Sequence, residues 1–265
     1  MKTFYLASRN RASDGAISHL KSELKKRGML GSVGSSDYII AVGDRTETFD
    51  IVLRQWRYGL PIIHLWAGES CSDWSTEDEV YRTSMTLMSM MQLCTNETAK
   101  KRVEAICNAT NKKPNAHVIG NVMMDDLSVD ESKIPKEPYI LVLYNPPTLL
   151  GKEEIRKDLK QIMTFIDKQN LLHLWIEPNG DRGSPFVSSY VTNKSLPRKQ
   201  FLGLLKNCKY FVTNSSSQFY EAPFFLKPDQ IIPVGSRNKA RESKDAEMKL
   251  PGATKRVVEL LKTLG

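Results

Sequence analysis

The stretch YIIAVGDRTETF, residues 38–49, runs from five apolar residues through a glycine–aspartate turn into an amphipathic segment. A short apolar run rich in β-branched residues is typical of a buried strand, and Gly43 ends it. The following residues have the apolar spacing of a helix. The same order of strand, polar turn and helix returns along the whole chain. It predicts an α/β protein with parallel sheets and crossover helices, as in Rossmann-like folds.

The alternation occurs in two runs that a polar segment separates. Residues 128–138, SVDESKIPKEP, contain two prolines and no apolar period, and we interpret them as a linker. We therefore expect two Rossmann-like domains, residues 1–127 and 139–265, facing a central cleft. In the first domain, strands are expected at 3–7, 38–42, 61–66, 93–95 and 117–120, and helices at 14–27, 46–58, 77–92 and 97–107. In the second, strands are expected at 139–144, 171–176, 210–213 and 230–234, and helices at 152–169, 198–207, 218–225 and 254–264.

Charge is distributed unevenly along the 265 residues. Residues 1–130 carry equal numbers of basic and acidic side chains, so the net charge of +8 lies entirely in residues 131–265. An excess of this kind favours an anionic ligand such as phosphate or nucleic acid, or is simply a solvated basic surface. No segment approaches the length of about 20 apolar residues that spans a bilayer, and we expect a cytoplasmic protein without membrane contact.

Cysteine and histidine spacing predicts neither a zinc site nor a disulfide framework. The four cysteines are far apart and form no CxxC pair, so buried single thiols are expected. His64 and His173 lie in apolar runs and are expected in the core. The cysteines are Cys71, Cys94, Cys107 and Cys208.

Three carboxylates follow predicted strands or open a helix in the first half. Asp44 follows the strand YIIAV, Glu69 follows PIIHLW, and Asp78 begins a helix. Because the carboxyl ends of parallel strands meet at one sheet edge, these side chains are expected to converge and to act as proton donors and acceptors. The alternative is that Asp44 caps a helix and that the acids of residues 77–79 complement a helix dipole, which we prefer for Glu79.

The second half offers a candidate phosphate site. The run TNSSSQ, residues 213–218, joins a strand to a helix, and Glu221 follows one turn later. Hydroxyl and backbone N–H groups at such a junction bind anions, and a carboxylate there can accept hydrogen bonds from a ribose diol. Arg237 follows the next strand, and a helix cap is the alternative interpretation. Neither GxGxxG nor GxxxxGK[ST] occurs, so neither a dinucleotide site nor a P-loop is indicated.

These loops, in this order, resemble the UDP-N-acetylglucosamine 2-epimerase family, especially its hydrolysing branch, which makes N-acetylmannosamine and UDP. The matching stretches are GDRTE, HLWAGE, EDEVYRTSMTLMS, VIGNVMMDDL, PYILVLYNPPT, WIEPNGDRGS, LLKNCKYFVTNSSSQFYEAP and VGSRNKAR. The resemblance implies a GT-B fold, with UDP held mainly by the second domain and without a cofactor or metal ion. It implies that Asp44, Glu69 and Asp78 are the catalytic carboxylates. The residues that it implies for UDP binding are Asn145, Asn179, Asn214, Ser215, Ser216, Ser217, Glu221 and Arg237.

The sequence departs from the family pattern at several points, including a loop between Glu69 and Asp78 that is about two residues longer. Asn145 stands where the family usually has histidine, Gln218 stands where it has glycine, and one strand and one helix precede residue 38 where the family has more. Since asparagine cannot titrate, we expect a UDP-sugar glycosyltransferase rather than an epimerase. Its acceptor would be a polyanion such as hydroxymethylated DNA, contacted by Arg9, Arg11 and Arg45.

Two other functions remain open at this point. The alternative to transfer is a hydrolysing UDP-N-acetylglucosamine 2-epimerase, which the three retained carboxylates favour. A non-catalytic module that binds a UDP-sugar is the third possibility. A homodimer is compatible with all of them.

Overall fold

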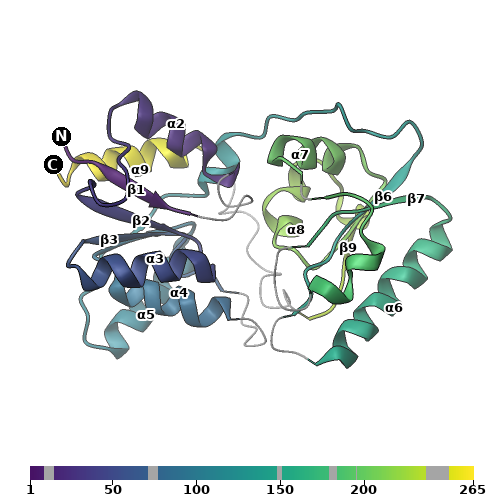
Figure 1. Ribbon diagram of the computed structural model, residues 1–265, viewed down its shortest axis with the longest axis horizontal. Coiled ribbons are helices and arrows are strands. Elements are labelled where there is room, and N and C mark those ends of the chain that lie inside the picture. The colour runs from purple at the N-terminus through teal and green to yellow at the C-terminus, as the bar shows by residue number, and fades with distance from the viewer. Residues whose placement is uncertain (9–14, 71–76, 148–150, 179–183, 195, 237–250) are drawn as a thin grey trace. The chain divides into compact units, whose positions relative to one another are not determined.

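The computed structural model describes the chain outside residues 9–14, 71–76, 148–150, 179–183, 195 and 237–250. The described residues form two compact units, and each is a parallel sheet flanked by helices (Figure 1). The first unit contains Met1–Ser70, Asp78–Asp126 and the C-terminal helix. The second contains the described part of Leu127–Ser243. The two runs of strand–helix alternation are thereby confirmed.

The first unit is built on a five-stranded parallel sheet in the order β1-β2-β3-β4-β5. Its central strands are buried on both faces, which explains why their sequences are apolar without alternation. Along β2, Ile40 contributes to the core on one face and Ile39 to the core on the other. The strands are β1 (Phe4–Ala7), β2 (Tyr38–Val42), β3 (Ile62–Leu65), β4 (Met91–Cys94) and β5 (Ala116–Val118).

Helices cover both faces of this sheet. On one face, Leu20 and Leu24 of α2 (Ser18–Lys26) pack in a core with residues of α9 (Ala253–Lys262). On the other, Val52 of α3 (Thr46–Arg57) and Met85 of α4 (Asp78–Met88) pack against β2 and β3. Helix α5 (Glu97–Ala109) follows β4 and buries Val103 and Cys107. Figure 1 shows α2 and α9 on one side of the strands and α3, α4 and α5 on the other.

The C-terminal helix differs from the expected domain boundaries. The sequence placed residues 139–265 in the second domain, whereas Val257, Val258 and Leu261 of α9 share a core with Phe4 of β1 and Leu24 of α2. The apolar stripe of α9 completes the sheet face that α2 alone leaves partly uncovered. The last helix therefore belongs to the first unit.

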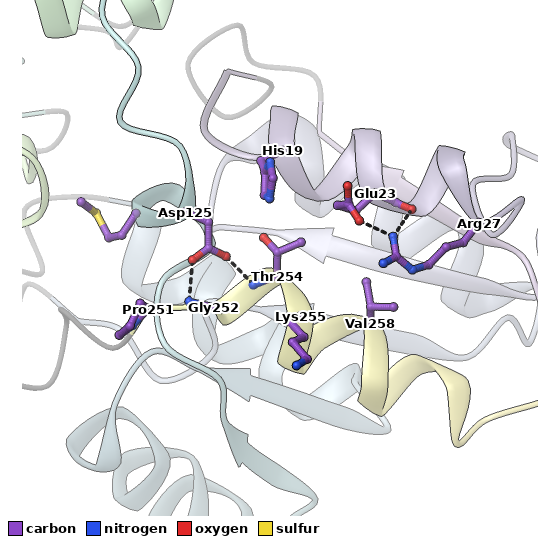
Figure 2. A pocket seen from close by; sticks show the side chains of 10 residues that line it. His19, Glu23, Arg27, Asp125, Pro251, Gly252, Thr254, Lys255 and Val258 are labelled. Atoms are coloured by element: carbon purple, nitrogen blue, oxygen red, sulfur yellow. Dashed lines mark hydrogen bonds and ion pairs between the residues drawn. The ribbon is translucent and has the colours of Figure 1, made fainter.

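Asp125 fixes the start of α9. It ends the short 3-10 helix η1 (Val122–Asp125), and its carboxylate accepts hydrogen bonds from the backbone N–H groups of Gly252, Ala253 and Thr254 at 2.9, 3.2 and 2.6 Å. Figure 2 shows this contact beside a hollow that residues of α2 and α9 line. Because Gly252, the residue before α9, has no side chain to cap the helix, the cap comes from 127 residues away in the chain.

The second unit has a four-stranded parallel sheet in the order β7-β6-β8-β9. From β6 the chain moves to β7 through α6 (Lys152–Gln169), and then to the other side of β6 through α7 (Arg198–Asn207). Helices α6 and α7 contribute to different cores on the two sheet faces. The loops after β6 and β8 therefore diverge at a topological switch point, where α/β proteins bind ligands. The strands are β6 (Tyr139–Leu143), β7 (Leu172–Trp175), β8 (Tyr210–Thr213) and β9 (Ile231–Pro233).

Short helices complete the second unit. The helix expected at 218–225 is instead a single α-helical turn followed by a 3-10 turn. The short helices are η2 (Ser184–Phe186), η3 (Ser188–Tyr190), α8 (Ser217–Tyr220), η4 (Ala222–Phe224) and η5 (Pro228–Gln230). In the first unit, the expected helix 77–92 ends at Met88, because Met91 already pairs with Ile63 in the sheet.

The segment expected as a linker is part of the second unit. Residues 128–138 contain no helix or strand, as expected, but Val129 and Ile134 pack against the second core. The backbone passes so close to α7 that a Cβ on Gly203 would lie 2.2 Å from the carbonyl oxygen of Asp130. The segment therefore has one defined path along α7.

The cysteine prediction holds for the thiols that the structure describes. Cys94, Cys107 and Cys208 are buried and form no disulfide, and Cys71 lies outside the described residues. None of the described helices has the length and apolar composition needed to cross a membrane.

We expect Asp125→Ala to lower the free energy of unfolding of the first unit by about 1–2 kcal/mol, because three N–H groups at the start of α9 lose their acceptor. Asp125→Asn keeps one acceptor oxygen and is expected to lose less. Urea unfolding followed by circular dichroism measures both. Equal stability of Asp125→Ala and the wild type would show that the cap does not hold α9.

Candidate active site

Asp44 lies at the carboxyl edge of the first sheet, directly after β2. Gly43 has a φ of 73°, a left-handed conformation that turns the chain sharply toward α3. The Asp44 carboxylate pairs with the guanidinium of Arg82 on α4. Arg82 is almost wholly buried, and its other terminal nitrogen lies 2.9 Å from Glu79. An ion pair in such a setting favours the charged forms of its partners.

Glu69 lies at the same edge, in the turn that follows β3. The chain turns there through two left-handed residues, Trp66 (φ 67°) and Gly68 (φ 75°). A Cβ on Gly68 would lie 2.1 Å from the carbonyl oxygen of Ala99, so only glycine fits at this position. The hydroxyl of Thr95, after β4, donates a hydrogen bond to the Glu69 carboxylate. Side chains that follow β3 and β4 thus meet, as the sequence predicts for neighbouring parallel strands.

Asp78 and Glu79 open α4 and face different partners. Asp78 lies 3.9 Å from the guanidinium of Arg45. Glu79 is buried, accepts a 3.0 Å hydrogen bond from Ser70 and pairs with Arg82. Glu79 lies in the first turn of α4, as its interpretation as a helix-dipole acid expects, and it is also paired with Arg82. Arg45, expected at an acceptor surface, is instead largely buried beside Asp78.

These contacts bring the first-half site residues together. Arg82 joins Asp44 and Glu79, Ser70 connects the end of the Glu69 turn to Glu79, and Arg45 forms a second pair with Asp78 at the start of α4. The arrangement can exchange protons with a ligand at the carboxyl edge of the sheet, because carboxylates there differ in partner and exposure. The sequence shows Arg82 behind the acidic cluster of residues 77–79, but its pairing with Asp44 was not predicted. Its position three residues after Glu79, on one helix face, was the available signal.

His64 is a buried residue of β3, as expected. Its Nδ1 lies 3.1 Å from the hydroxyl of Thr86 and its Nε2 lies 3.0 Å from the carbonyl oxygen of Gly43. Burial lowers the pKa of His64 to about 4, with a further lowering by the charge of Arg82; the hydrogen bond to Gly43 and the charge of Asp44 oppose this. The ring is therefore neutral at pH 7. Among the described residues, no cluster of three or more histidine, cysteine, aspartate or glutamate side chains could hold a metal ion.

Asn145 and Asn214 join the two diverging loops of the second unit. The side-chain oxygen of Asn214 accepts a 2.7 Å hydrogen bond from the backbone N–H of Asn145, and its side-chain nitrogen donates a 2.8 Å bond to the carbonyl oxygen of Asn145. Both residues are buried. This reciprocal pair fixes the ends of β6 and β8 at the switch point.

The serine loop follows Asn214 and is held by hydrogen bonds of its own. The backbone N–H of Ser215 donates to Thr213 at 2.9 Å, and the Ser215 hydroxyl donates to the Ser217 hydroxyl at 3.2 Å. The sequence predicts that the loop lies at the N-terminus of a helix over residues 218–225. In the structure Ser216 instead precedes α8, which is only four residues long. Any anion binding here depends on hydroxyl and local N–H groups more than on a helix dipole.

Glu221 lies in the same loop region and is oriented by a residue that sequence reasoning missed. The Nε of Arg198, the first residue of α7, donates a 3.1 Å hydrogen bond to the Glu221 carboxylate, and Glu221 is 4% exposed. A positive charge in the first turn of a helix is unfavourable with the helix dipole. An arginine at position 198 therefore indicated, in the sequence, that it has an acidic partner. The candidate residues Arg9, Arg11, Asn179 and Arg237 lie outside the described residues.

Comparison with known proteins points to one family. The model of a family described as UDP-N-acetylglucosamine 2-epimerase matches residues 26–265. A GDP/UDP-N,N′-diacetylbacillosamine 2-epimerase (hydrolyzing) of Campylobacter jejuni is 25% identical over 77% of this chain and 58% of its own length. A UDP-N-acetylglucosamine 2-epimerase of Neisseria meningitidis is 26% identical over 77% of this chain and 57% of its own. The chain thus spans less than three fifths of these relatives.

Solved structures share the fold at lower identity. An S. aureus MnaA–UDP co-structure superposes with a TM-score of 0.65 at 16% identity, covering 97% of this chain and 80% of that one. A Neisseria meningitidis UDP-GlcNAc 2-epimerase bound to UDP-GlcNAc superposes with a TM-score of 0.60 at 18% identity. The match covers 94% of this chain and 80% of that one. The expected α/β fold class of GT-B type, with two Rossmann-like units, is confirmed by these likenesses.

We expect His64 to make stability depend on pH. As the pH falls from 6.5 toward 4, the unfolded chain protonates His64 at its ordinary pKa while the folded chain does not, so the unfolding free energy falls by up to about 3 kcal/mol. Glutamine cannot titrate, so His64→Gln should lack this pH-dependent part of the unfolding free energy. Urea unfolding at pH 7 and pH 4.5 compares the two proteins. His19→Gln, at a partly buried site on α2, is the control, and an equal pH dependence in wild type and His64→Gln would contradict the assignment.

Proposed function

Since the chain belongs to the UDP-N-acetylglucosamine 2-epimerase family, we propose that it is a hydrolysing 2-epimerase that inverts C2 of a UDP-linked N-acetylhexosamine and releases UDP. The observation that carries the proposal is the set of carboxylates Asp44, Glu69 and Asp78 at one sheet edge, with arginines among them. Removal of the C2 proton by a base lets UDP leave C1 as a C1–C2 double bond forms. Water then adds its hydroxyl group to C1, while an acid returns a proton to the opposite face of C2. A site with several carboxylates in different environments can supply both.

In this proposal the second unit binds the nucleotide. Asn145 and Asn214 shape the switch point, and the hydroxyl and N–H groups of Ser215, Ser216 and Ser217 face the diphosphate. Glu221 accepts hydrogen bonds from the ribose diol, while Arg198 fixes the orientation of its carboxylate. Arg237 and Asn179 are assigned to UDP by motif position alone.

Asn145 alters how the leaving group departs. An asparagine donates a neutral hydrogen bond but transfers no proton, so it cannot protonate the diphosphate. UDP carries its own negative charge and leaves as an anion, and the serine loop then supplies the compensating hydrogen bonds. The proposal therefore requires no titratable group at position 145.

Glycosyl transfer to modified DNA, our first expectation from the sequence, has no support among these relatives. The family model and the names of the Campylobacter jejuni and Neisseria meningitidis relatives describe 2-epimerases, which favours the alternative. The largely buried position of Arg45 also removes one of the three arginines proposed to contact DNA.

The proposal predicts solvent exchange at the sugar C2. In D2O, the purified protein should release UDP from UDP-N-acetylglucosamine and leave deuterium at C2 of the freed 2-epimer, both measured by NMR. Asp44→Asn, Glu69→Gln and Asp78→Asn should each lower the rate at least about 100-fold, since each removes a proton-transferring or orienting carboxylate. Asp50→Asn, at an exposed site on α3, is the matched control.

Two results would replace this function. Movement of the sugar to an acceptor hydroxyl without deuterium at C2 would indicate a transferase. Tight UDP binding without turnover of any N-acetylhexosamine donor would indicate a binding module.

The nucleotide assignment predicts a ribose-dependent loss of affinity. Glu221→Gln and Arg198→Met should weaken UDP binding about tenfold, because a charge-assisted hydrogen bond to the diol is lost or misdirected. Neither should change the affinity for 2′,3′-dideoxy-UDP, which lacks the diol. Isothermal titration calorimetry measures both ligands, and Glu131→Gln, on the surface of the same unit, is the control. An equal loss for both ligands would place Glu221 away from the ribose.

A further inference from the structure

His64 connects the turn that carries Asp44 to the helix that carries Asp78, Glu79 and Arg82. Its imidazole, on β3, is fully buried and makes one contact on each side. One ring nitrogen is bonded to the carbonyl of Gly43, the residue before Asp44. The other is bonded to Thr86, four residues after Arg82 on α4.

The partners of His64 determine its tautomer. A carbonyl oxygen can only accept, so Nε2 must carry the hydrogen that it donates to Gly43. In the neutral ring Nδ1 then accepts, and the hydroxyl of Thr86 donates to it. Burial keeps the ring neutral, and the two contacts select the tautomer with hydrogen on Nε2.

Asp44 is consequently held from two directions by groups anchored on the same helix. Its side chain pairs with Arg82, and the carbonyl that precedes it is bonded to His64, which in turn is bonded to Thr86. Arg82 and Thr86 are separated by one helical turn and lie on one face of α4. A shift of the Gly43 turn would therefore disturb both the His64 contact and the pair of Asp44 with Arg82.

We propose that His64 is a positioning residue that fixes the backbone of Asp44 relative to the carboxylates of α4. The effect of this positioning on the reaction rate rests on the proposed epimerase function. Proton transfer from carbon requires the carboxylate and the C–H bond to be aligned, and a displacement of about 1 Å can cost about 100-fold in rate. The ring itself exchanges no proton with substrate, because both of its nitrogens are engaged inside the protein.

Two substitutions separate positioning from simple filling of the core. The amide nitrogen of glutamine can reach the position of the imidazole Nε2, so His64→Gln can keep the bond to Gly43. Asparagine is one methylene shorter, so His64→Asn can keep a partner for Thr86 but loses Gly43. His19→Asn, at a partly buried site on α2, is the matched control.

We expect His64→Asn to lower kcat for UDP release about 10- to 100-fold, with the Kd for UDP changed less than twofold, because UDP is assigned to the second unit. His64→Gln should recover most of the rate. Thr86→Val should lower kcat less than His64→Asn, because the bond to Gly43 remains. Equal kcat in His64→Asn and His64→Gln, with both proteins folded, would overturn the proposal.

Hydrogen exchange tests the same inference without turnover. The backbone amides of residues 43–46 should exchange faster in His64→Asn than in the wild type and in His64→Gln, and ¹⁵N NMR should show the Nε2–H tautomer. Unchanged exchange in His64→Asn, or an Nδ1–H tautomer, would overturn the positioning role. A wild type that shows this protection but no C2 exchange would refute the epimerase function alone.

Discussion

The buried guanidinium of Arg82 is the interaction on which the candidate site depends. It is almost entirely removed from water and lies against the carboxylates of Asp44 and Glu79. A cation in such a place is stable only when it is surrounded by acceptors, and an uncompensated charge there would cost several kcal/mol. The turn after β2 and the first turns of α4 are therefore forced into one arrangement. The ion pairs of Arg82 therefore determine both the geometry of the candidate site and the stability of this edge of the first sheet.

The sequence predicted regular elements well where local pattern and tertiary packing agree. The strand Tyr38–Val42 and the helices Lys152–Gln169 and Arg198–Asn207 have the expected bounds, because an apolar run or a helical stripe defines each of them. The helix α9 was also predicted, but its assignment to the second domain was wrong, since nothing local to residues 253–262 shows which sheet their apolar stripe covers. The prediction also extended α4 too far, because the methionines near its end fit a buried strand as well as a helix.

The candidate site shows the same division. Asp44, Glu69 and Asp78 were predicted because polar residues after parallel strands lie at one sheet edge, and their catalytic roles stay predictions. The pairing of Arg82 with Asp44 and of Arg198 with Glu221 was not predicted, because both arginines lie in helices, where an arginine is usually a solvated surface residue. His64 was placed in the core correctly, but its two hydrogen bonds depend on segments 21 and 22 residues away.

The course of the chain through the first unit has a consequence for its synthesis. All five strands of the sheet have been synthesised once β5 is made. One face of the sheet, however, is covered only when α9 is present, and Asp125 has no helix amides to accept from until then. The second unit lies between them in sequence and carries its own cores. On the ribosome, the later unit can therefore fold first, and the earlier one reaches its final stability only after α9 emerges, which reverses the usual N-to-C order.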